Sequence, residues 1–265
     1  MVLDQINPFS GKILWTESCP STMNLAYEQV QQHTMKPGDL LLAGYQSQGR
    51  GRHLHRTWIS QPRTGFLSTL ILTRAQIQKP LALRVGLSVC RLIEEKFGLP
   101  TQLKWPNDVL IYGKKIAGIL IEQRSDLVLI GLGMNLWGTP PIHGTTIEDS
   151  FSAFLAANPE EVATQHKFDQ WSSIQHDYLS GVRDLAQSYL NFLEQAMTDP
   201  DWRRAVRFRL AYRNTLVELG DSQDSSEPRI GVRGVLRDID KDGGVLIDLE
   251  SGNQLKITSG SLKPV

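Results

Sequence analysis

The sequence predicts an α+β fold: helices packed on a mixed β-sheet, followed by a small β-rich domain. Two apolar runs rich in β-branched residues, 116–123 and 127–132, are typical of buried strands. Residues 81–97 and much of 150–210 have apolar side chains at helical spacing. From about residue 212 onward, short strand-like runs alternate with turn residues, which indicates a small β-barrel. We therefore place the two domains at residues 1–211 and 212–265.

The first domain begins with alternating strands and helices. We expect strands at 13–15, 40–45 and 66–72, a helix at 21–33 that Ser21 or Thr22 caps, and a helix at 81–97 that ends at Gly98. Further strands are expected near 103, at 109–112 and in the two runs named above. The long segment 46–62 has no internal periodicity and is therefore a candidate functional loop. In the second domain the expected strands are 215–219, 231–239, 244–249 and 254–257, with a polar, mobile run from Ser222 to Pro228.

Composition restricts the possible functions. The chain has 28 basic and 28 acidic residues, so its net charge is zero and it has no domain-wide basic field for nucleic acid. Cys19 and Cys90 form no CxxC pair, which argues against a zinc site and a disulfide framework. We see no signal peptide and no apolar stretch of membrane-spanning length, and we expect a cytoplasmic protein.

The segment 45–52 combines closely spaced glycines with arginines. Gly49 and Gly51 let backbone N–H groups approach a ligand, and Arg50 and Arg52 offer forked donors that fit carboxylate and phosphate oxygens. Taken alone, such a loop is more often a solvated turn. Trp58, further along the loop, could stack on a purine, but an ordinary anchor for the loop end is the simpler interpretation.

Two later segments add polar groups beside the apolar runs. Residues 104–108, Lys-Trp-Pro-Asn-Asp, place Asn107 and Asp108 between two strands, where they could simply form an Asx-turn. Lys115 opens the following strand and could supply a point charge for an anionic substrate. Residues 131–136 contain a GxGxN string ending at Asn135, which alone indicates only a bulge with a turn asparagine. No activated serine or HExxH metal helix is present.

Together these segments resemble the biotin protein ligases in content and in chain order. The matches are Glu17–Thr22, the Gly-Arg loop, Trp58–Ser60, the KWPND and KKIAGILIE strings, and the GxGxN string, so they cover about residues 15–137. The β-rich tail is similar to the small SH3-like domain of that family. The resemblance implies that biotin is activated with MgATP to biotinyl-5′-AMP and then transferred to a lysine of the biotin carboxyl carrier protein of acetyl-CoA carboxylase.

The resemblance also assigns roles to residues. Lys115, Arg50 and Arg52 would supply the catalytic positive charge. Biotin would be bound by Ser21, Thr22, Met23, Gln46, Gly49, Arg50, Gly51, Arg52, Lys115 and Gly118. ATP and the adenylate would be bound by Arg50, Arg52, Trp58, Asn107, Lys115 and Asn135, and Asp108 would hold Mg²⁺. The segment from Gln48 to Thr57 is expected to be mobile without ligand and to order over the adenylate.

Three features depart from the family pattern. Met23 stands where the family often has asparagine, and the loop before Trp58 is one residue longer and lacks a glycine. Only about a dozen residues precede the first ligase strand, so we expect no helix-turn-helix unit and no specific DNA binding. A lipoate or octanoate attachment enzyme on the same scaffold is the first alternative, and a nucleic-acid-binding module is the second.

Overall fold

The protein was analysed as a computed structural model that describes residues 2–3, 7–52, 57–160, 167, 171–172, 175–220 and 231–265. Three sequence predictions fall partly or wholly outside the described residues. They are the behaviour of the loop at 53–56, including the register before Trp58, the helical pattern of 150–210 where it covers 161–166, 168–170 and 173–174, and the mobility of the run 222–228.

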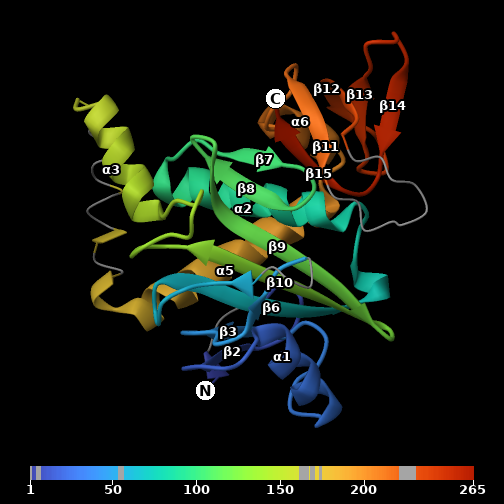
Figure 1. The fold of residues 1–265 in the computed structure, drawn as a ribbon. Helices are drawn as coiled ribbons and strands as arrows, with labels where there is room; N and C mark the ends of the chain where they lie inside the picture. The colour runs from blue at the N-terminus through green and yellow to red at the C-terminus, as the bar shows by residue number, and fades with distance from the viewer. Residues whose placement is uncertain are drawn as a thin grey trace.

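A large mixed sheet forms the centre of the first domain (Figure 1). Its strands β2 and β3 pair in parallel, whereas its other pairings are antiparallel. The sequence prediction of a mixed sheet is therefore confirmed. In spatial order the strands are β1 (Val2–Leu3), β2 (Ile13–Thr16), β3 (Leu40–Ala43), β6 (Gly65–Thr73), β10 (Leu127–Asn135), β9 (Lys114–Arg124), β8 (Asp108–Ile111) and β7 (Gln102–Lys104).

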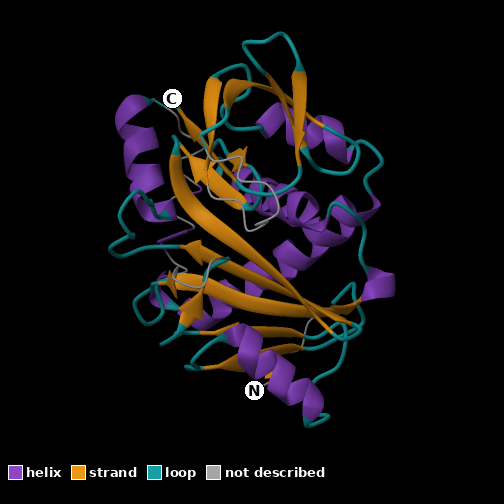
Figure 2. Cartoon of the chain, turned by 45° about the vertical axis from the view of Figure 1, so that its right-hand side comes forward, coloured by secondary structure: helices purple, strands orange, loops and turns teal. Residues whose placement is uncertain are grey.

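Helices cover the two faces of this sheet unequally. On one face α2 (Leu81–Phe97) and α5 (Tyr178–Thr198) pack side by side over the main core, which Figure 2 shows behind the strands. Helix α1 (Thr22–Gln31) covers only part of the opposite face, with a small core at Ala26, Leu41 and Ile71. The uncovered part of that face, over β9 and β10, is where a ligand can reach the sheet. Helices α3 (Ile147–Ala157) and α6 (Trp202–Arg209) and the short helix η1 (Arg74–Gln76) lie at the edges.

The C-terminal residues form a separate antiparallel sheet of five strands. Its order is β14 (Gln254–Ile257), β13 (Val245–Asp248), β12 (Arg233–Ile239), β11 (Leu216–Gly220) and β15 (Ser261–Pro264). Its inward side chains, such as Val217, Leu236 and Ile247, join the main core. The hydrogen bonds among the described residues leave this sheet open at β14 and β15, so it is consistent with an SH3-like domain but does not close into the expected barrel.

Several boundaries differ from the sequence prediction for identifiable reasons. Helix α3 begins at Ile147 instead of residue 150 because the Thr146 hydroxyl accepts a hydrogen bond from the Asp149 backbone N–H. The segment 46–62, predicted as loop, contains two antiparallel strands of two residues each, β4 (Gly49–Arg50) and β5 (Thr57–Trp58). Strand β15 was not predicted, since Ser-Leu-Lys-Pro has little β-propensity and is held by its neighbour β11.

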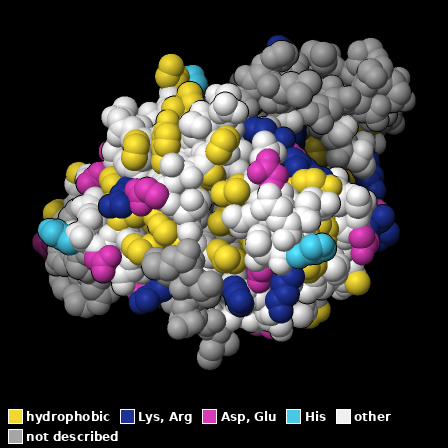
Figure 3. All heavy atoms as spheres, turned by 90° about the horizontal axis from the view of Figure 1, so that it is seen from below, with side chains coloured by type: hydrophobic (Ala, Val, Ile, Leu, Met, Phe, Trp, Pro, Cys, Tyr) yellow, Lys and Arg dark blue, Asp and Glu magenta, His cyan; other side chains and the backbone are white. Residues whose placement is uncertain are grey.

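The surface carries both signs of charge close together. On the face shown in Figure 3, Lys and Arg side chains are scattered among Asp and Glu side chains. None of the described helices combines the length and the apolar character that crossing a membrane requires.

Candidate functional site

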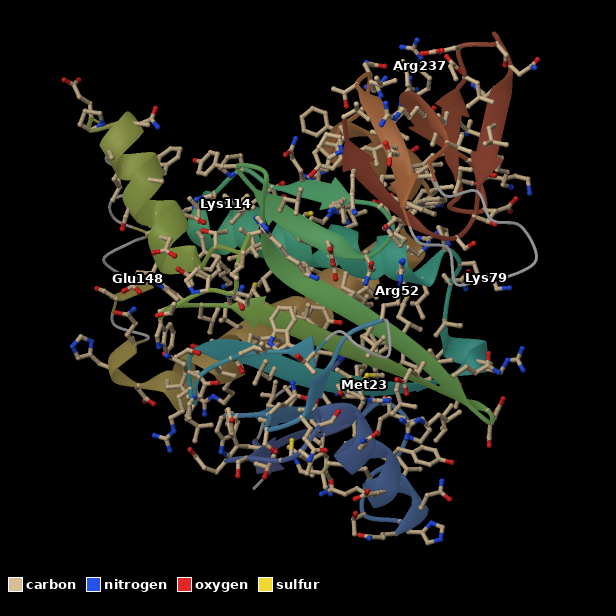
Figure 4. The ribbon with its side chains drawn as sticks, viewed as in Figure 1. Met23, Arg52, Lys79, Lys114, Glu148 and Arg237 are labelled. Atoms are coloured by element: carbon tan, nitrogen blue, oxygen red, sulfur yellow. The ribbon has the colours of Figure 1, made fainter. Side chains whose placement is uncertain are left out.

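A cavity opens on the uncovered face of the large sheet, between α1, the β4–β5 hairpin and the start of β9. Eleven of the predicted site residues line it, although they come from segments as far apart in sequence as residues 21 and 118. They are Ser21, Thr22, Met23, Gln46, Arg50, Gly51, Arg52, Trp58, Asn107, Lys115 and Gly118. In Figure 4, Met23 lies between α1 and the sheet, and Arg52 lies between the large sheet and the C-terminal sheet.

Three predicted residues lie next to this cavity. Gly49 is in β4 and pairs with Trp58. Asp108 and Asn135 line an adjoining cavity that also contains Trp58 and Lys115. Asn135 is buried, and its side-chain amide donates to the Thr145 carbonyl oxygen at 3.1 Å, so it fixes the loop that follows β10.

The end of the cavity beside α1 is a network of neutral hydrogen bonds. The Thr69 hydroxyl donates to the Thr22 hydroxyl at 2.9 Å, and the Thr22 hydroxyl donates to Gln46 Oε1 at 3.0 Å. The Thr22 backbone N–H also donates to Gln46 Oε1, at 2.7 Å. A backbone N–H is always a donor, so the atom it meets must be the amide oxygen, and the Gln46 NH₂ group is left to face a ligand.

The backbone around Gln46 is also held firmly. Cys19 and Gln46 form a parallel bridge, and the Ser47 N–H donates to the Cys19 carbonyl at 3.0 Å. Ser21 is the N-cap of α1, yet its side chain makes no capping hydrogen bond, contrary to our expectation of a capping role for Ser21 or Thr22. Burial raises the pKa of the Cys19 thiol to about 11, so this cysteine remains protonated at neutral pH.

Glycines on β9 and β10 make the floor of the cavity flat. Gly118 and Gly133 are cross-strand partners, and the Trp58 indole lies against both of them. A Cβ atom at Gly133 would come within 2.5 Å of the indole, and one at Gly131 would come within 2.9 Å of the Met23 sulfur. The two glycines of the GxGxN string therefore make room for two large side chains, one at each end of the cavity.

The other end of the cavity is charged. Arg50 forms an ion pair with Glu122 at 2.8 Å, and Lys115 forms one with Asp108 at 2.6 Å. The Arg50 and Lys115 side chains are 37% and 39% exposed, so water still reaches both. The Lys115 ammonium lies 5.8 Å from the centre of the Trp58 ring. These side chains can exchange a protein carboxylate for an incoming anion at small cost, because exposed ion pairs contribute little.

Arg52 links three parts of the chain. Its guanidinium donates to the Gly260 carbonyl of the C-terminal domain at 2.6 Å and to Asn107 Oδ1 at 3.4 Å. Asn107 in turn donates to the Ile119 carbonyl at 2.7 Å, so the KWPND segment is fixed to β9. An Asx-turn alone, the simpler interpretation of Asn107, does not account for these contacts.

The carboxylates at the charged end can be compared with the ligands that Mg²⁺ requires. Within the described part of the chain, no group of three His, Cys, Asp or Glu residues could hold a metal ion. Mg²⁺ in nucleotide sites is commonly held by one or two carboxylates together with substrate phosphates. Asp108 supplies one carboxylate at the charged end, so the residues present fit a Mg²⁺ ion that arrives with a nucleotide.

Sequence reasoning missed three features of the site. Thr69 starts the hydrogen-bond network from the middle of β6, where nothing in the local sequence marks it as different from its neighbours. The Trp58 indole N–H is buried without a hydrogen-bond partner among the described residues, which makes it a donor for a ligand. The contribution of the C-terminal domain at Gly260 was also not predicted, since it depends on how the two domains pack.

The fold and the cavity thus define a class: a mixed-sheet domain whose cavity presents neutral hydrogen-bonding groups at one end and cationic side chains at the other. Residues 15–135 match the biotin/lipoate A/B protein ligase family. The chain is 34% identical over 172 residues to the bifunctional ligase/repressor BirA of Bacillus subtilis, an alignment covering 62% of this chain and 50% of that one. It is 36% identical over 110 residues to the biotin–[acetyl-CoA-carboxylase] ligase of Mycobacterium tuberculosis, covering 39% and 41%.

A solved structure of similar fold is the biotin protein ligase from Aquifex aeolicus in complex with biotin and ATP. It has a TM-score of 0.65 and 25% identity, covering 95% of this chain and 97% of that one. A mutant of the same enzyme in complex with biotin superposes with a TM-score of 0.70 at 23% identity, covering 96% and 98%. These comparisons confirm the resemblance to the biotin protein ligases that the motifs indicated. In sequence, the chain spans only about half the length of the B. subtilis relative.

Proposed function

We propose that this protein is a biotin protein ligase that activates biotin with MgATP and transfers it to a lysine of the biotin carboxyl carrier protein of acetyl-CoA carboxylase. In the first step a biotin carboxylate oxygen attacks the α-phosphorus of ATP. The bond from that phosphorus to the oxygen bridging to the β-phosphate breaks, and pyrophosphate leaves with the electron pair. In the second step the lysine amine attacks the acyl carbon, AMP leaves, and the amine loses a proton.

The single observation that carries this proposal is the fixed orientation of the Gln46 amide. Thr22 occupies its oxygen, which leaves its NH₂ group for a ligand in the cavity that Gln46 lines, and one lone pair of the Thr22 hydroxyl remains available as well. A donor next to an acceptor complements a carbonyl flanked by N–H groups, which is the cyclic urea of biotin. Leaving such buried groups unpaired disfavours the alkyl chain of octanoate and the dithiolane of lipoate, the alternative substrates in this family.

The charged end of the cavity suits the adenylation step. We assign Lys115 and Arg50 to the carboxylate and the α-phosphate, where negative charge gathers as the bond forms. Asn107 and Asn135 would hold the loops that bind the nucleotide, and Trp58 would cover the adenine. Asp108 would contribute to the Mg²⁺ that accompanies ATP. These roles need no nucleophile from the enzyme, because alignment and charge neutralisation are sufficient.

We further propose that residues 1–211 are the catalytic domain and that residues 212–265 are an SH3-like domain packed against it. A cytoplasmic location is supported by Cys19 and Cys90, which are both unpaired thiols, as is usual in a reducing compartment.

The experiment that tests the function is transfer of labelled biotin to an isolated carrier domain. We expect labelling of the acceptor lysine only when ATP and Mg²⁺ are present, and none on a carrier whose acceptor lysine is replaced by arginine. Parallel reactions with labelled octanoate and lipoate should leave the carrier unlabelled. Labelling by either of these acids at the rate of biotin would favour the alternative enzyme class.

A further inference from the structure

Arg124, at the end of β9, has no role in the assignments above, yet it holds the carboxylate that pairs with Arg50. Arg124 and Glu122 lie two residues apart on β9, so their side chains share one face of the strand. Arg124 Nε and Nη2 both donate to Glu122 Oε2, at 3.2 Å and 2.8 Å. The other oxygen of the same carboxylate, Oε1, pairs with Arg50 Nη2 at 2.8 Å. Glu122 is therefore shared by two guanidinium groups, one on each oxygen.

The two arginines differ in how they are anchored. Arg124 Nη2 also donates to Asn24 Oδ1 at 3.0 Å, and the Arg124 guanidinium lies 4.8 Å from the centre of the Tyr27 ring. Asn24 and Tyr27 both belong to α1, so Arg124 is held from a second element as well as from β9. Its side chain is 25% exposed, against 37% for Arg50. Arg50 lines the cavity, so an anion that enters there meets Arg50, and Arg50 is the partner that can leave Glu122.

Glu122 is only partly open to solvent, so the number of cations beside it matters. Its side chain is 24% exposed, and removing one partner of a partly buried ion pair leaves a charge that water compensates incompletely. When Arg50 leaves Glu122, the carboxylate still has Arg124 on its second oxygen. Without Arg124, the same departure would leave Glu122 with no cationic partner among the described residues. Arg124 therefore lowers the cost of releasing Arg50.

We propose that Arg124 is a positioning residue for adenylate formation, which keeps Glu122 neutralised while Arg50 turns from that carboxylate to the anionic reactants. This inference rests on the proposed function, which assigns Arg50 to the biotin carboxylate and the α-phosphate. Arg124 stays beside Glu122 because α1 anchors it, so it acts through Arg50 and needs no contact with a substrate. Loss of the charge at position 124 should therefore leave Arg50 bound more tightly to Glu122 and less available to the reactants.

Biotin-dependent ATP–pyrophosphate exchange by the full chain tests this role. In Arg124→Gln, which removes the charge, kcat/KM for ATP should fall by roughly two- to fivefold, the size of effect that one partly exposed ion pair gives. Arg124→Lys keeps the charge and gives up the forked contacts, so it should recover most of that loss. The double variant Arg124→Gln with Glu122→Gln should exchange like Glu122→Gln alone, because a neutral side chain at position 122 has no charge to leave uncompensated. A merely structural role of Arg124, in holding α1, would leave the defect in the double variant.

Arg63→Gln is the matched control. Arg63 donates to both oxygens of Glu17 at 2.8 Å, and neither residue is among the described residues that line the cavity, so exchange should equal that of the unmodified protein. Unchanged exchange in folded Arg124→Gln would overturn the inference. A loss in Arg124→Lys as large as that in Arg124→Gln, or a loss that persists in the double variant, would overturn it as well. Biotin-dependent exchange by the unmodified protein upholds the proposed function even if Arg124 has no effect, and its absence removes both.

Discussion

The two ends of the cavity on the large sheet are built on different physical principles. Beside α1, Thr22 is 2% exposed and is joined to Thr69 and Gln46 by short hydrogen bonds between neutral groups. At the other end, Arg50 and Lys115 are more than a third exposed, and each is held by a carboxylate of the protein. One end is therefore already arranged for its ligand, whereas the other is arranged to exchange partners.

This difference indicates where selectivity and catalysis arise. Buried neutral donors and acceptors reject a ligand that leaves them unpaired, at a cost of about 1–3 kcal/mol for each group. Exposed ion pairs are individually weak, so an anionic substrate can replace Glu122 or Asp108 at little cost. Substitutions at the neutral end should therefore change which acid is accepted, and substitutions at the charged end should change how fast it is activated.

The largest effect is expected for Lys115→Ala. Removing a positioned charge that stabilises a transition state costs about 2.7–4 kcal/mol, a loss of about 10²–10³ in the rate of adenylate formation. Biotin-dependent ATP–pyrophosphate exchange measures this rate. Lys114→Ala is the matched control, because Lys114 is exposed at the start of the same strand and does not line the cavity. Near-normal exchange by folded Lys115→Ala would show that this lysine does not act in the chemical step.

A smaller and different effect is expected for Gln46→Ala. Loss of this half-buried donor should raise the KM for biotin by about 5- to 150-fold, corresponding to about 1–3 kcal/mol, and should change the KM for ATP little. Steady-state kinetics with each substrate varied separately would measure both constants. Gln48→Ala, at an exposed position two residues along the loop, should leave both unchanged. A Gln46 variant that lost affinity for ATP instead would contradict the assignment of biotin to the neutral end of the cavity and of the nucleotide to the charged end.

Two alanine substitutions on β10 sharpen the comparison. Gly131→Ala would push against Met23 at the neutral end, and Gly133→Ala would push against the Trp58 indole at the charged end. Overpacking of this kind costs about 1–3 kcal/mol. We expect Gly131→Ala to raise mainly the KM for biotin and Gly133→Ala to raise mainly the KM for ATP. Identical kinetic changes in the two variants would mean that the ends of the cavity are not independent.

The smallest effect is expected for Glu122→Gln, which frees Arg50 from its carboxylate partner. An ion pair exposed to this degree contributes about 0.2–1 kcal/mol, so adenylate formation should change by no more than about fivefold. Glu17→Gln is the control, since Glu17 pairs with Arg63 at the same 2.8 Å distance outside the cavity. A hundredfold loss of exchange in Glu122→Gln alone would place Glu122 in the chemistry itself.

The parts of this site that the sequence predicted are those set by local patterns. The apolar runs that became β9 and β10 and the periodicity of α2 predicted those elements closely, and Gly98 ends α2 with a φ of 69° as its position implied. The motif residues could be named because each stands in a recognisable string.

The contacts that give those residues their roles depend on tertiary packing and could not be predicted. Thr69 donates to Thr22, which in turn holds Gln46, only because β6 lies beside α1, and Gly260 reaches Arg52 across 208 residues of chain. The partners of the two cations, Glu122 and Asp108, likewise follow from strand register and not from motif spacing. The arrangement of the C-terminal strands in an open five-stranded sheet also depends on tertiary packing.

The central claim is that the fixed Gln46 amide selects biotin and that the adjacent cations activate it. Its most direct test is ATP–pyrophosphate exchange driven by biotin, octanoate or lipoate in parallel, with no carrier protein present. We predict exchange with biotin alone, and loss of that preference for biotin in Gln46→Ala. Exchange driven equally by octanoate or lipoate, or no exchange with biotin, would contradict the account.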